Sequence, residues 1–527
     1  MFDWSFPYHS RRAPVFARNV VATSQPLATQ AGIDMLRRGG NAVDAAIATA
    51  ITLTVVEPAM NGVGSDAFAI VWDGNDLTGI NGSGKSPAAW KPDRFEGPNM
   101  PTQGWDSVTV PGAVSTWIAL SKKFGELPFE DLFEPAIRYA RDGFQVGTKT
   151  SSIWSWSVDS FAHFDNFQKH FAPLGRAPEP GEAFLRPDLV DTLLDIARTG
   201  GESMYRGRLA QAIVSQSQHE GGAITLEDLA NHSVLWTNPI AQPYRHVVLH
   251  EIPPNGQGLA AQIALSILER LDVHSIEPGS ADWIHFQVEA MKIAIRAAFD
   301  HFADPAAMTV PSSELLEPGS IARAANAISK HTALESPPVA LPVSADTVYL
   351  ATADADGRMV SMIQSNYRGF GSGIVIDGTG ISMQNRGSGF VLTPGHPNIV
   401  DGGKRPFHTI IPGFVTRADG SPAMAFGVMG GHMQHQGHVQ MVTRVFDHGE
   451  NPQAASDAPR WHVSPDYRLA LEKGTSSITV KSLIERGHET AVVQDEGLFG
   501  GAQLICRLDD GYCAASDHRK EGMAAGF

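Results

Sequence analysis

Cysteine is nearly absent from this chain: among 527 residues only Cys506 and Cys513 occur, both near the C-terminus. Two such cysteines provide neither a disulfide framework nor a spacing typical of metal or redox sites. A chain of this length can bury enough apolar surface to fold without cross-links. We therefore expect a reduced, cytoplasmic protein.

Long hydrophobic runs and an excess of positive charge are also missing. The longest apolar stretch, residues 45–56, is interrupted by threonines and is too short to span a bilayer. Residues 1–16 lack the uninterrupted apolar segment of a secretory signal. With 40 basic and 56 acidic residues the net charge is −16, which disfavours binding to nucleic acids or anionic membranes. We expect neither as a partner.

What is present is the composition of a folded protein, with 43% apolar and 18% charged residues. Helical patterns dominate the first part of the chain, for example at 25–38, from Ala42 onward and at 280–300. Strand patterns dominate the last part. Between them, residues 331–346 contain three prolines and little charge, which indicates an extended connector.

The segment 79-GINGSGKS-86 fits the glycine-rich loop that binds nucleotide phosphates. In such a loop a helix must begin at the Lys-Ser and direct its positive end at the phosphate. Here Pro92 ends that helix after about one turn, and no later strand offers a clear magnesium-binding aspartate. We therefore expect a glycine turn and not a nucleotide site.

The junction between Asp346 and Thr347 combines two local signals. The connector ends there, and alternating segments at 347–354 and 358–364, joined by a turn at 354–357, predict a β-hairpin. Thr347 is either a β-branched residue that opens a strand or a nucleophile released by chain cleavage. In the second case its new α-amino group, with an ordinary pKa of roughly 7.7–8.0, serves as the base for its own hydroxyl.

A second candidate region is 427-GVMGGHMQ-434, where glycines mark a strand-to-helix transition. Free N–H groups of Gly430 and Gly431 there form either an oxyanion hole or only a tight turn. His432, His435 and His438 follow at helical spacing, so they could bind a metal. The helix is weakened by a glycine and no acidic ligand is close in sequence, so polar histidines at a helix end are the competing interpretation.

Several long motifs, in order along nearly the whole chain, resemble the γ-glutamyltranspeptidase family of N-terminal-nucleophile hydrolases. They are 39-GGNAVDAAIATAITLTVVEPAMNGVGSDAF-68, 110-VPGA-113, 124-FGELPFEDLFEPAIRYARDGF-144, 253-PPNGQG-258, 285-HFQVEAMKIA-294, 347-TVYLATADADGRMVSMIQS-365 and 403-GKRPFHTIIP-412, followed by the glycine pair. The resemblance implies an α+β fold, a four-layer αββα sandwich. It also implies a proenzyme that cleaves itself between Asp346 and Thr347, leaving a large fragment 1–346 and a small fragment 347–527 within one αββα unit.

The resemblance also assigns roles to individual residues. Thr347 matches the catalytic nucleophile, Ser365 the hydroxyl that supports it, and Gly430 with Gly431 the oxyanion hole. No metal and no organic cofactor is implied. The partners implied are a small-molecule amide and the two fragments of one precursor; whether two such heterodimers pair into a dimer is left open.

The sequence departs from the family pattern at the positions that hold the substrate head group. The γ-glutamyl enzymes bind the substrate's α-carboxylate through an arginine and its ammonium through an acidic residue. Here the arginine position is Ser83, with Lys85 nearby, and the acidic position is Gly389. The other changed positions in this group are Arg386, Tyr367, His408 and Thr409.

These departures remove the acceptor for an ammonium group and add cationic or neutral donors. An ammonium without a partner costs several kcal/mol in a desolvated site. We therefore expect an amidohydrolase whose acyl group has a carboxylate and no amine, with Tyr367, Arg386, His408, Thr409, Lys85 and Ser83 as substrate contacts. Oxamate is the specific substrate expected. The alternatives are a γ-glutamyl hydrolase or transferase with altered contacts, and an unprocessed binding protein.

Overall fold

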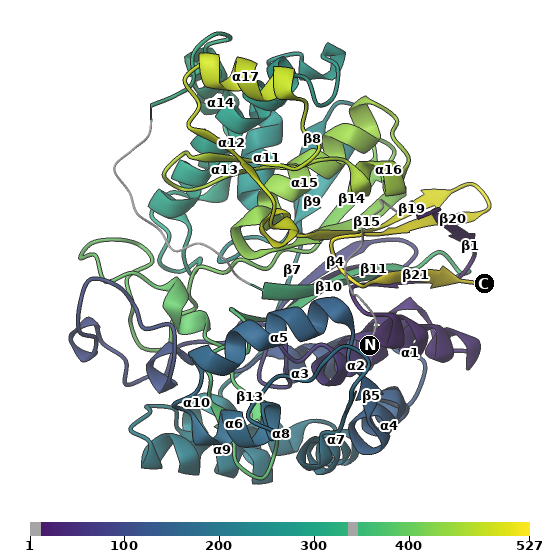
Figure 1. The fold of residues 1–527 in the computed structure, drawn as a ribbon, viewed down its shortest axis with the longest axis vertical. Helices are drawn as coiled ribbons and strands as arrows, with labels where there is room; N and C mark the ends of the chain where they lie inside the picture. Colours follow the sequence, from purple (N-terminus) through teal and green to yellow (C-terminus); the bar gives the residue numbers. More distant parts are fainter. Residues whose placement is uncertain (1–11, 336–345) are drawn as a thin grey trace.

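The computed structural model describes residues 12–335 and 346–527. The predictions made for residues 1–16 and for the connector 331–346 lie largely outside the described residues, and the side chain of Asp346 is also outside them. Two seven-stranded sheets stack face to face at the centre of the molecule (Figure 1). Helices cover the outer face of each sheet, so the predicted α+β sandwich of four layers is confirmed.

Each sheet combines strands from both ends of the chain. Sheet 1 has the order β21 (Met523–Gly526), β2 (Val20–Thr23), β10 (Asp346–Ala353), β11 (Met359–Tyr367), β3 (Asp66–Trp72), β4 (Leu77–Asn81), β7 (Leu235–Thr237). Sheet 2 has the order β1 (Val15–Ala17), β20 (Gly511–Ser516), β19 (Gly501–Leu508), β15 (Pro422–Met429), β14 (Gly413–Arg417), β9 (Val247–Glu251), β8 (Ile240–Tyr244). The parts before and after the connector are therefore interleaved in one core.

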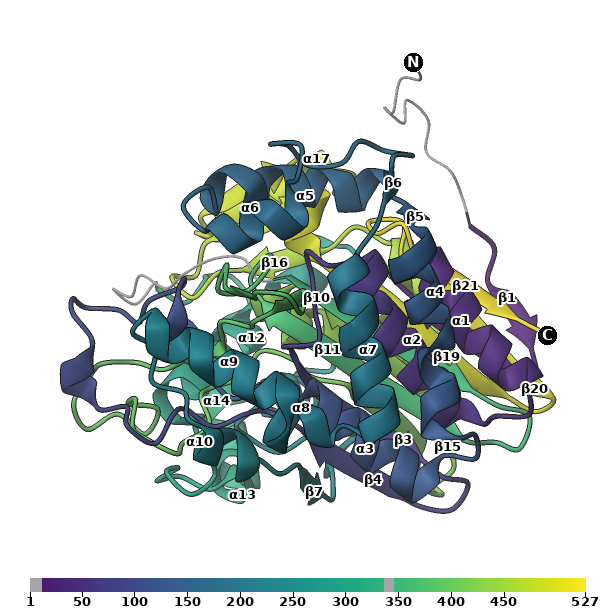
Figure 2. The ribbon, with the colours of Figure 1, turned by 90° about the horizontal axis from the view of Figure 1, so that it is seen from below.

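The outer helices follow from the apolar patterns of the sequence. Helix α2 (Ala42–Val56) begins at a capping box between Asn41 and Asp44 and is buried along its whole length against β10 and β11. Figure 2 shows the layer outside it. The helices of this side are α1 (Pro26–Arg37), α3 (Ala113–Phe124), α4 (Glu134–Asp142), α5 (Thr148–Ser160), α6 (Asp165–Phe171), α7 (Pro187–Thr199), α8 (Glu202–Arg206), α9 (Arg208–His219) and α10 (Leu226–Ala230).

The helices over sheet 2 come from the middle and the end of the chain. Helix α11 (Gly258–Glu269) packs on β8 and β9, and the long helix α12 (Ala281–His301) packs outside it. The remaining members are α13 (Ser312–Leu315), α14 (Pro318–Ala327), α15 (Gln434–Val442), α16 (Pro452–Asp457) and α17 (Ser477–Glu485), with a small sheet of β16 (Trp461–Val463), β17 (Leu469–Glu472) and β18 (Thr490–Val493). Among the described residues, no helix is both long and apolar enough to cross a membrane.

The predicted hairpin is confirmed, because β10 and β11 pair antiparallel with Leu350 opposite Met362. In contrast, the tract around 150–190, in which apolar residues follow no clear period, contains α5 and α6. Its aromatic residues pack on one another and on the distant Phe370. The ring centre of Trp154 is 5.4 Å from that of Phe370, and the ring centre of Phe171 is 4.7 Å from that of Phe370. Contacts with a distant loop, rather than a regular apolar stripe, stabilise these helices.

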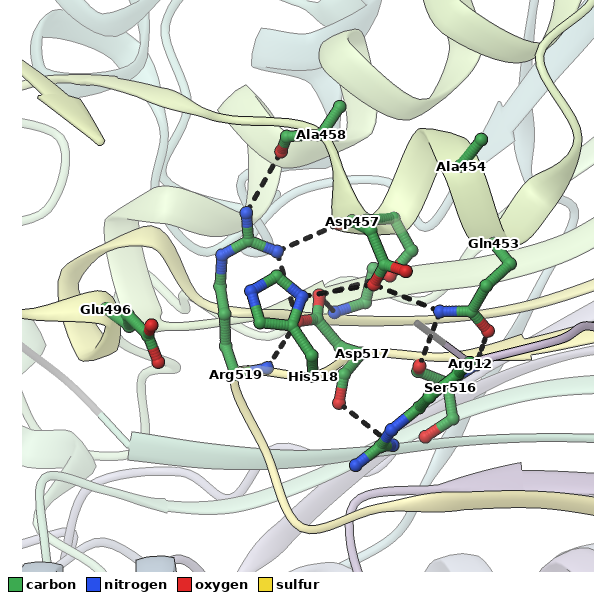
Figure 3. A network of polar contacts seen from close by, with 12 residues as sticks. Arg12, Gln453, Ala454, Asp457, Ala458, Glu496, Ser516, Asp517, His518 and Arg519 are labelled. Atoms are coloured by element: carbon green, nitrogen blue, oxygen red, sulfur yellow. Dashed lines mark hydrogen bonds and ion pairs between the residues drawn. The ribbon is translucent and has the colours of Figure 1, made fainter. Parts of the chain in front are cut away.

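A buried ionic network attaches the C-terminal loop to sheet 2 and α16 (Figure 3). The Asp517 carboxylate accepts from Arg460 Nη2 at 2.5 Å and from Arg519 Nη1 at 3.1 Å, and all three side chains are buried. Burial alone would raise the pKa of Asp517, but Arg460 and Arg519 hold it well below its ordinary value. The loop leads into β21, which borders β2 in sheet 1.

We predict that Asp517→Asn destabilises the fold by about 3–5 kcal/mol, because it leaves the buried Arg460 without its carboxylate partner and Arg519 with Glu472 alone. Since the folded-state pKa of Asp517 is depressed, its contribution is complete above the unfolded-state pKa of about 3.9 and disappears as the pH falls through the folded-state value. The melting temperatures of the wild type and the variant should therefore differ at neutral pH and begin to approach each other as the pH falls below about 4.

Thermal unfolding followed by circular dichroism checks this prediction. The control is Asp509→Asn in the exposed β19–β20 turn, which should melt like the wild type. Equal melting temperatures for Asp517→Asn and wild type at neutral pH would contradict the structural role of the network.

Candidate active site

Three polar residues lie side by side across neighbouring strands at one end of sheet 1. Asp66 of β3 is directly opposite Ser365 of β11, and Thr347 of β10 hydrogen-bonds to Ser365 from the other side. All three are buried, with at most 1% of any residue exposed. Antiparallel pairing thus assembles a row of a hydroxyl, a hydroxyl and a carboxylate from segments far apart in sequence.

The alternation of side chains along each strand shows which face of sheet 1 carries this row. Phe68, Tyr349 and Ile363, each two residues from a member of the row, belong to the core between the two sheets. Since side chains two apart on a strand share a face, Asp66, Thr347 and Ser365 also face sheet 2. The row therefore lies between the sheets.

Thr347 is held by neutral partners. Its Oγ1 donates to Ser365 Oγ at 3.3 Å and accepts from Gln434 Nε2 at 3.4 Å. Ser365 Oγ in turn accepts the Tyr367 N–H at 2.7 Å. These contacts fix the direction of the threonine hydroxyl without placing a charge on it.

Gly430 and Gly431 lie where β15 ends and a short 3₁₀ turn (Gly431–Met433) leads into α15. Both have positive φ, 114° and 57°, which glycine adopts readily. The first N–H groups of a helix have no intrahelical acceptor and carry partial positive charge. The glycine pair, close to Thr347 through Gln434, is thus suited to bind a developing oxyanion.

Gln257 connects the glycine pair to the neighbouring loop. Its Nε2 donates to Thr409 O at 2.6 Å and to Gly431 O at 2.8 Å. Thr409 Oγ1 accepts from Arg386 Nη1 at 2.8 Å. The candidate oxyanion donors and the candidate substrate arginine are therefore held in one network.

Arg386 is a buried cation with unused hydrogen-bond donors. Only 1% of the residue is exposed, and apart from Nη1 its guanidinium nitrogens, Nε and Nη2, have no partner among the described residues. Those two atoms share one edge of the planar group, the edge that binds a carboxylate through two parallel hydrogen bonds. Burial lowers the pKa of Arg386 to about 10, so it is cationic at neutral pH.

Tyr367 covers this arginine, with the guanidinium carbon 4.7 Å from the centre of its ring. Its φ of 82° is unusual for a residue with a Cβ, and such strain is found most often at ligand sites. In the antiparallel pair of β10 and β11, Tyr367 lies opposite Asp346. Tyr367 thus stacks on Arg386 at the end of β11 that pairs with the start of β10.

Tyr367 also lines a cavity of about 570 Å³, whose described lining includes neither Thr347 nor Arg386. Tyr367 and His432, which follow Ser365 and Gly431 closely in sequence, both line it, as does Gly389. Most of the other lining residues are apolar, and the described lining contains no aspartate or glutamate: Pro98, Asn99, Met100, Thr102, Ala298, Phe299, Phe302, Arg368, Ser388, Phe390, Val391, Leu392, Thr393, His396, Asn398 and Phe407. A Cβ at Gly389 would lie 2.5 Å from Phe407 O, so no side chain fits there without a backbone shift.

The remaining predicted contacts lie at different depths. His408 is buried, with Nε2 3.1 Å from Asp66 Oδ2, and burial together with the Arg386 charge holds its pKa well below the ordinary value. Ser83 is buried and bonds Asn81 Oδ1 through both its N–H and its hydroxyl. Lys85 is exposed at the surface and is not brought into the group around Thr347.

Within the segment 79–86, residues 79–81 are the end of β4 and residues 82–86 form an irregular loop, and no helix begins at the Lys-Ser pair. Its glycines allow close approach of a second loop: a Cβ at Gly84 would lie 1.5 Å from Val110 O, and one at Gly112 would lie 1.4 Å from Gly82 O. The N–H groups of Gly84 and Gly112 both point at Asp66 Oδ1, at 3.4 Å and 3.0 Å. The anion held by this loop is thus the protein's own carboxylate.

The histidines of α15 and its first turn do not form a metal site with one another. His438 Nδ1 is 2.6 Å from Glu251 Oε1, and His432 stacks on Phe407 with ring centres 6.1 Å apart. His435 is buried without a hydrogen-bond partner among the described residues.

Elsewhere, His285, Glu289 and His488 lie close enough for a metal, but a protein cation already lies among them. Lys292 Nζ is 2.7 Å from Glu289 Oε1 and 3.5 Å from His488 Nδ1. An ammonium group there opposes a second cation electrostatically.

Sequence reasoning did not identify Asp66, Gln257 or Gln434 as functional candidates. All three lie inside segments that drew attention, namely 39–68, 253–258 and 427–434. Their side chains reach the site only because a strand, a helix start and a loop converge there. No local pattern marks them, so only their position in these segments could have pointed to them.

A protein family and individual relatives match this chain over nearly its whole length. The sequence profile described as gamma-glutamyltranspeptidase matches residues 28–527. The glutathione hydrolase-like YwrD proenzyme of Bacillus subtilis (strain 168) is 36% identical over 527 residues, covering 98% of this chain and 100% of that protein. The oxamate amidohydrolase proenzyme of Klebsiella pneumoniae is 33% identical over 516 residues, covering 95% of this chain and 97% of that protein.

A solved structure also matches this chain over its whole length. The crystal structure of cephalosporin acylase from Bacillus halodurans has a TM-score of 0.95 and 44% identity, and the match covers 100% of this chain and 99% of that one. The chain therefore belongs to the γ-glutamyltranspeptidase family of N-terminal-nucleophile hydrolases, and it is a hydrolase made as a proenzyme.

Proposed function

We propose that this protein is an N-terminal-threonine amidohydrolase that cleaves itself between Asp346 and Thr347 and then hydrolyses a monoamide of a dicarboxylic acid. The main support is Arg386, whose Nε and Nη2 are buried without partners among the described residues, beneath the ring of Tyr367, two residues after Ser365. A carboxylate on the acyl group satisfies both donors at once. The fragments would be residues 1–346 and 347–527.

The hydrolytic step uses the groups around Thr347. Its α-amino group takes the hydroxyl proton as Oγ1 attacks the substrate carbonyl, and the Gly430 and Gly431 N–H groups bind the oxyanion. The proton passes to the leaving nitrogen, the C–N bond breaks and an ester remains on Oγ1. Water, deprotonated by the same amine, then releases the acyl group as a second carboxylate. Ser365 and Gln434 orient Oγ1 throughout.

The cavity lining supports a substrate without an ammonium group. No acidic side chain is present in its described lining, and the backbone leaves no room for one at Gly389. An ammonium brought into this space would lose its hydration without gaining a counter-ion. A γ-glutamyl group differs from a glutaryl group by such an ammonium, so the glutaryl group is favoured.

The size of the cavity bears on the rest of the substrate. Oxamate has an acyl group of minimal length and releases only ammonia, so it would leave most of about 570 Å³ empty. Apolar walls around Phe299, Phe390 and Phe407 favour a bulky, partly apolar leaving amine or a longer acyl chain. The solved relative titled cephalosporin acylase supports the same choice. Oxamate stays the smallest member of the proposed class.

We predict that Thr347→Ala abolishes self-cleavage, because the attacking hydroxyl is removed. On a denaturing gel and by intact mass, the wild type should give two fragments that meet at Asp346 and Thr347, and the variant one chain of 56.5 kDa. Thr352→Ala removes a hydroxyl from the opposite face of the same strand, where it donates to Ala42 O, and should still cleave.

Two outcomes would contradict the self-processing step. If Thr347→Ala is cut at the same bond, another group is the nucleophile. If the wild type stays intact in solution, the protein fits the alternative of an unprocessed binding protein.

We also predict a substrate order set by the carboxylate. Glutaryl p-nitroanilide should be hydrolysed faster than butyryl p-nitroanilide, which lacks the carboxylate, and faster than γ-glutamyl p-nitroanilide, which adds the ammonium. Arg386→Gln should lower kcat/KM for the glutaryl compound about 10–100-fold, the loss expected for hydrogen bonds to a charged group, and leave the butyryl compound nearly unchanged.

Arg444→Gln is the matched control, because Arg444 is another buried arginine stacked on an aromatic ring, Trp283 at 4.9 Å, on the far side of sheet 2. It should retain the preference for the glutaryl compound. Ammonia release from oxamate is measured in parallel. A preference for γ-glutamyl p-nitroanilide would favour the glutathione-type alternative and overturn the proposed substrate class.

A further inference from the structure

Asp66 is a buried carboxylate that the proposed reaction does not use. It is fully buried, lies opposite Ser365 in the β3–β11 pair and faces the space between the sheets. Burying a carboxylate is costly unless its oxygens are well paired. Its position at the end of the row that starts with Thr347 calls for a functional explanation.

The contacts of Asp66 fit an ionised carboxylate. Oδ1 accepts the N–H groups of Gly84 and Gly112, and Oδ2 is 3.1 Å from His408 Nε2. The other ring nitrogen of His408, Nδ1, accepts the Ile410 N–H at 3.3 Å. The neutral imidazole therefore carries its proton on Nε2 and donates it to Asp66.

The charge of Asp66 reaches the substrate arginine through neighbouring residues. Thr409, which accepts from Arg386, directly follows His408, which donates to Asp66. Arg386 is the charged group with the largest effect on Asp66, and Asp66 is in turn the largest electrostatic influence on Arg386. The other charged or titratable groups that act on Asp66, or on which it acts, are Arg405 and Tyr205.

The Asp66 carboxyl group has its pKa near neutral pH. Burial raises its pKa to about 7, against the opposing influence of Arg386, the two glycine N–H groups and Arg405. Near neutral pH the carboxylate therefore exists in both forms. Only the ionised form balances the charge of Arg386.

We propose that Asp66 is a positioning residue that sets the affinity of Arg386 for the substrate carboxylate. Ionised Asp66 shares the arginine charge with the substrate, whereas protonated Asp66 leaves the whole charge available to it. This inference rests on the proposed function, because it requires a carboxylate at Arg386. It adds that carboxylate binding and protonation of Asp66 favour each other.

Linkage between carboxylate binding at Arg386 and protonation of Asp66 sets the direction of the pH dependence. A second anion near Arg386 repels the Asp66 charge, so a bound carboxylate raises the proton affinity of Asp66. Reciprocally, a protonated Asp66 strengthens carboxylate binding by the same factor. Preference for a carboxylate-bearing substrate therefore increases as the pH falls through about 7 and levels off on either side.

The test measures the ratio of kcat/KM for glutaryl and butyryl p-nitroanilide in the processed enzyme from pH 6 to pH 8.5. The Thr347 amine titrates for both substrates, so its effect cancels in the ratio. In the wild type the ratio should be about tenfold higher at pH 6 than at pH 8.5, within the usual range of coupling between sites.

Asp66→Asn should hold the ratio at the acid value of the wild type at every pH, because asparagine is neutral and its Oδ1 can still accept from the two glycines. Arg386→Gln should bring the ratio close to one without pH dependence. Glu251→Gln alters another buried carboxylate–histidine pair, with His438 in sheet 2's helix layer, and should keep the wild-type profile.

The outcomes separate this inference from the proposed function. A ratio near one in the wild type at all pH values means that the carboxylate is not recognised, and both fail. A high ratio without pH dependence in the wild type, or an unchanged pH profile in Asp66→Asn, overturns the role of Asp66 alone. The wild-type profile needs no variant, so the inference stays testable even if Asp66→Asn does not fold.

Discussion

The antiparallel pairing of β10 with β11, and of β11 with β3, is the constraint on which the site depends. It places Thr347 beside Ser365 and Ser365 opposite Asp66, all facing sheet 2. A slip of one residue in this register would turn each side chain toward the helices. The buried helix α2 behind the strands and the inter-sheet core in front of them leave no room for such a slip.

The second constraint is the cost of burying charge. Arg386, Asp66 and His408 lie in a dry interior, where every donor and acceptor must find a partner. The glycines of the loop 79–86 and of its neighbour satisfy Asp66 with backbone N–H groups, which side chains at those positions would exclude sterically. What Arg386 lacks, among the described residues, is an acceptor for Nε and Nη2. A structural arginine such as Arg460 instead has a carboxylate partner, Asp517, although its Nε also has no partner among the described residues.

Much of the architecture was predictable from local patterns and from the resemblance. The hairpin at Thr347 and the buried helix from Ala42 both appear in the structure, and the glycine-rich segment 79–86 opens no helix. The helices between 148 and 171 were not predictable, because their aromatic residues pack on a distant loop and follow no helical period. Ser83 and Lys85 were predicted together as substrate contacts, but Ser83 is buried and Lys85 is exposed.

By itself, the sequence determined the family, the α+β class and the residues that are chemically able to react, because those depend on ordered motifs and residue types. Only the tertiary structure decided which of these residues meet. It brought Asp66 to His408 over 342 residues of chain and left two nitrogens of Arg386 without partners among the described residues, beneath the Tyr367 ring that lines the cavity. Hydrogen bonds and buried charges act over a few ångströms in space, and distance along a chain does not specify them.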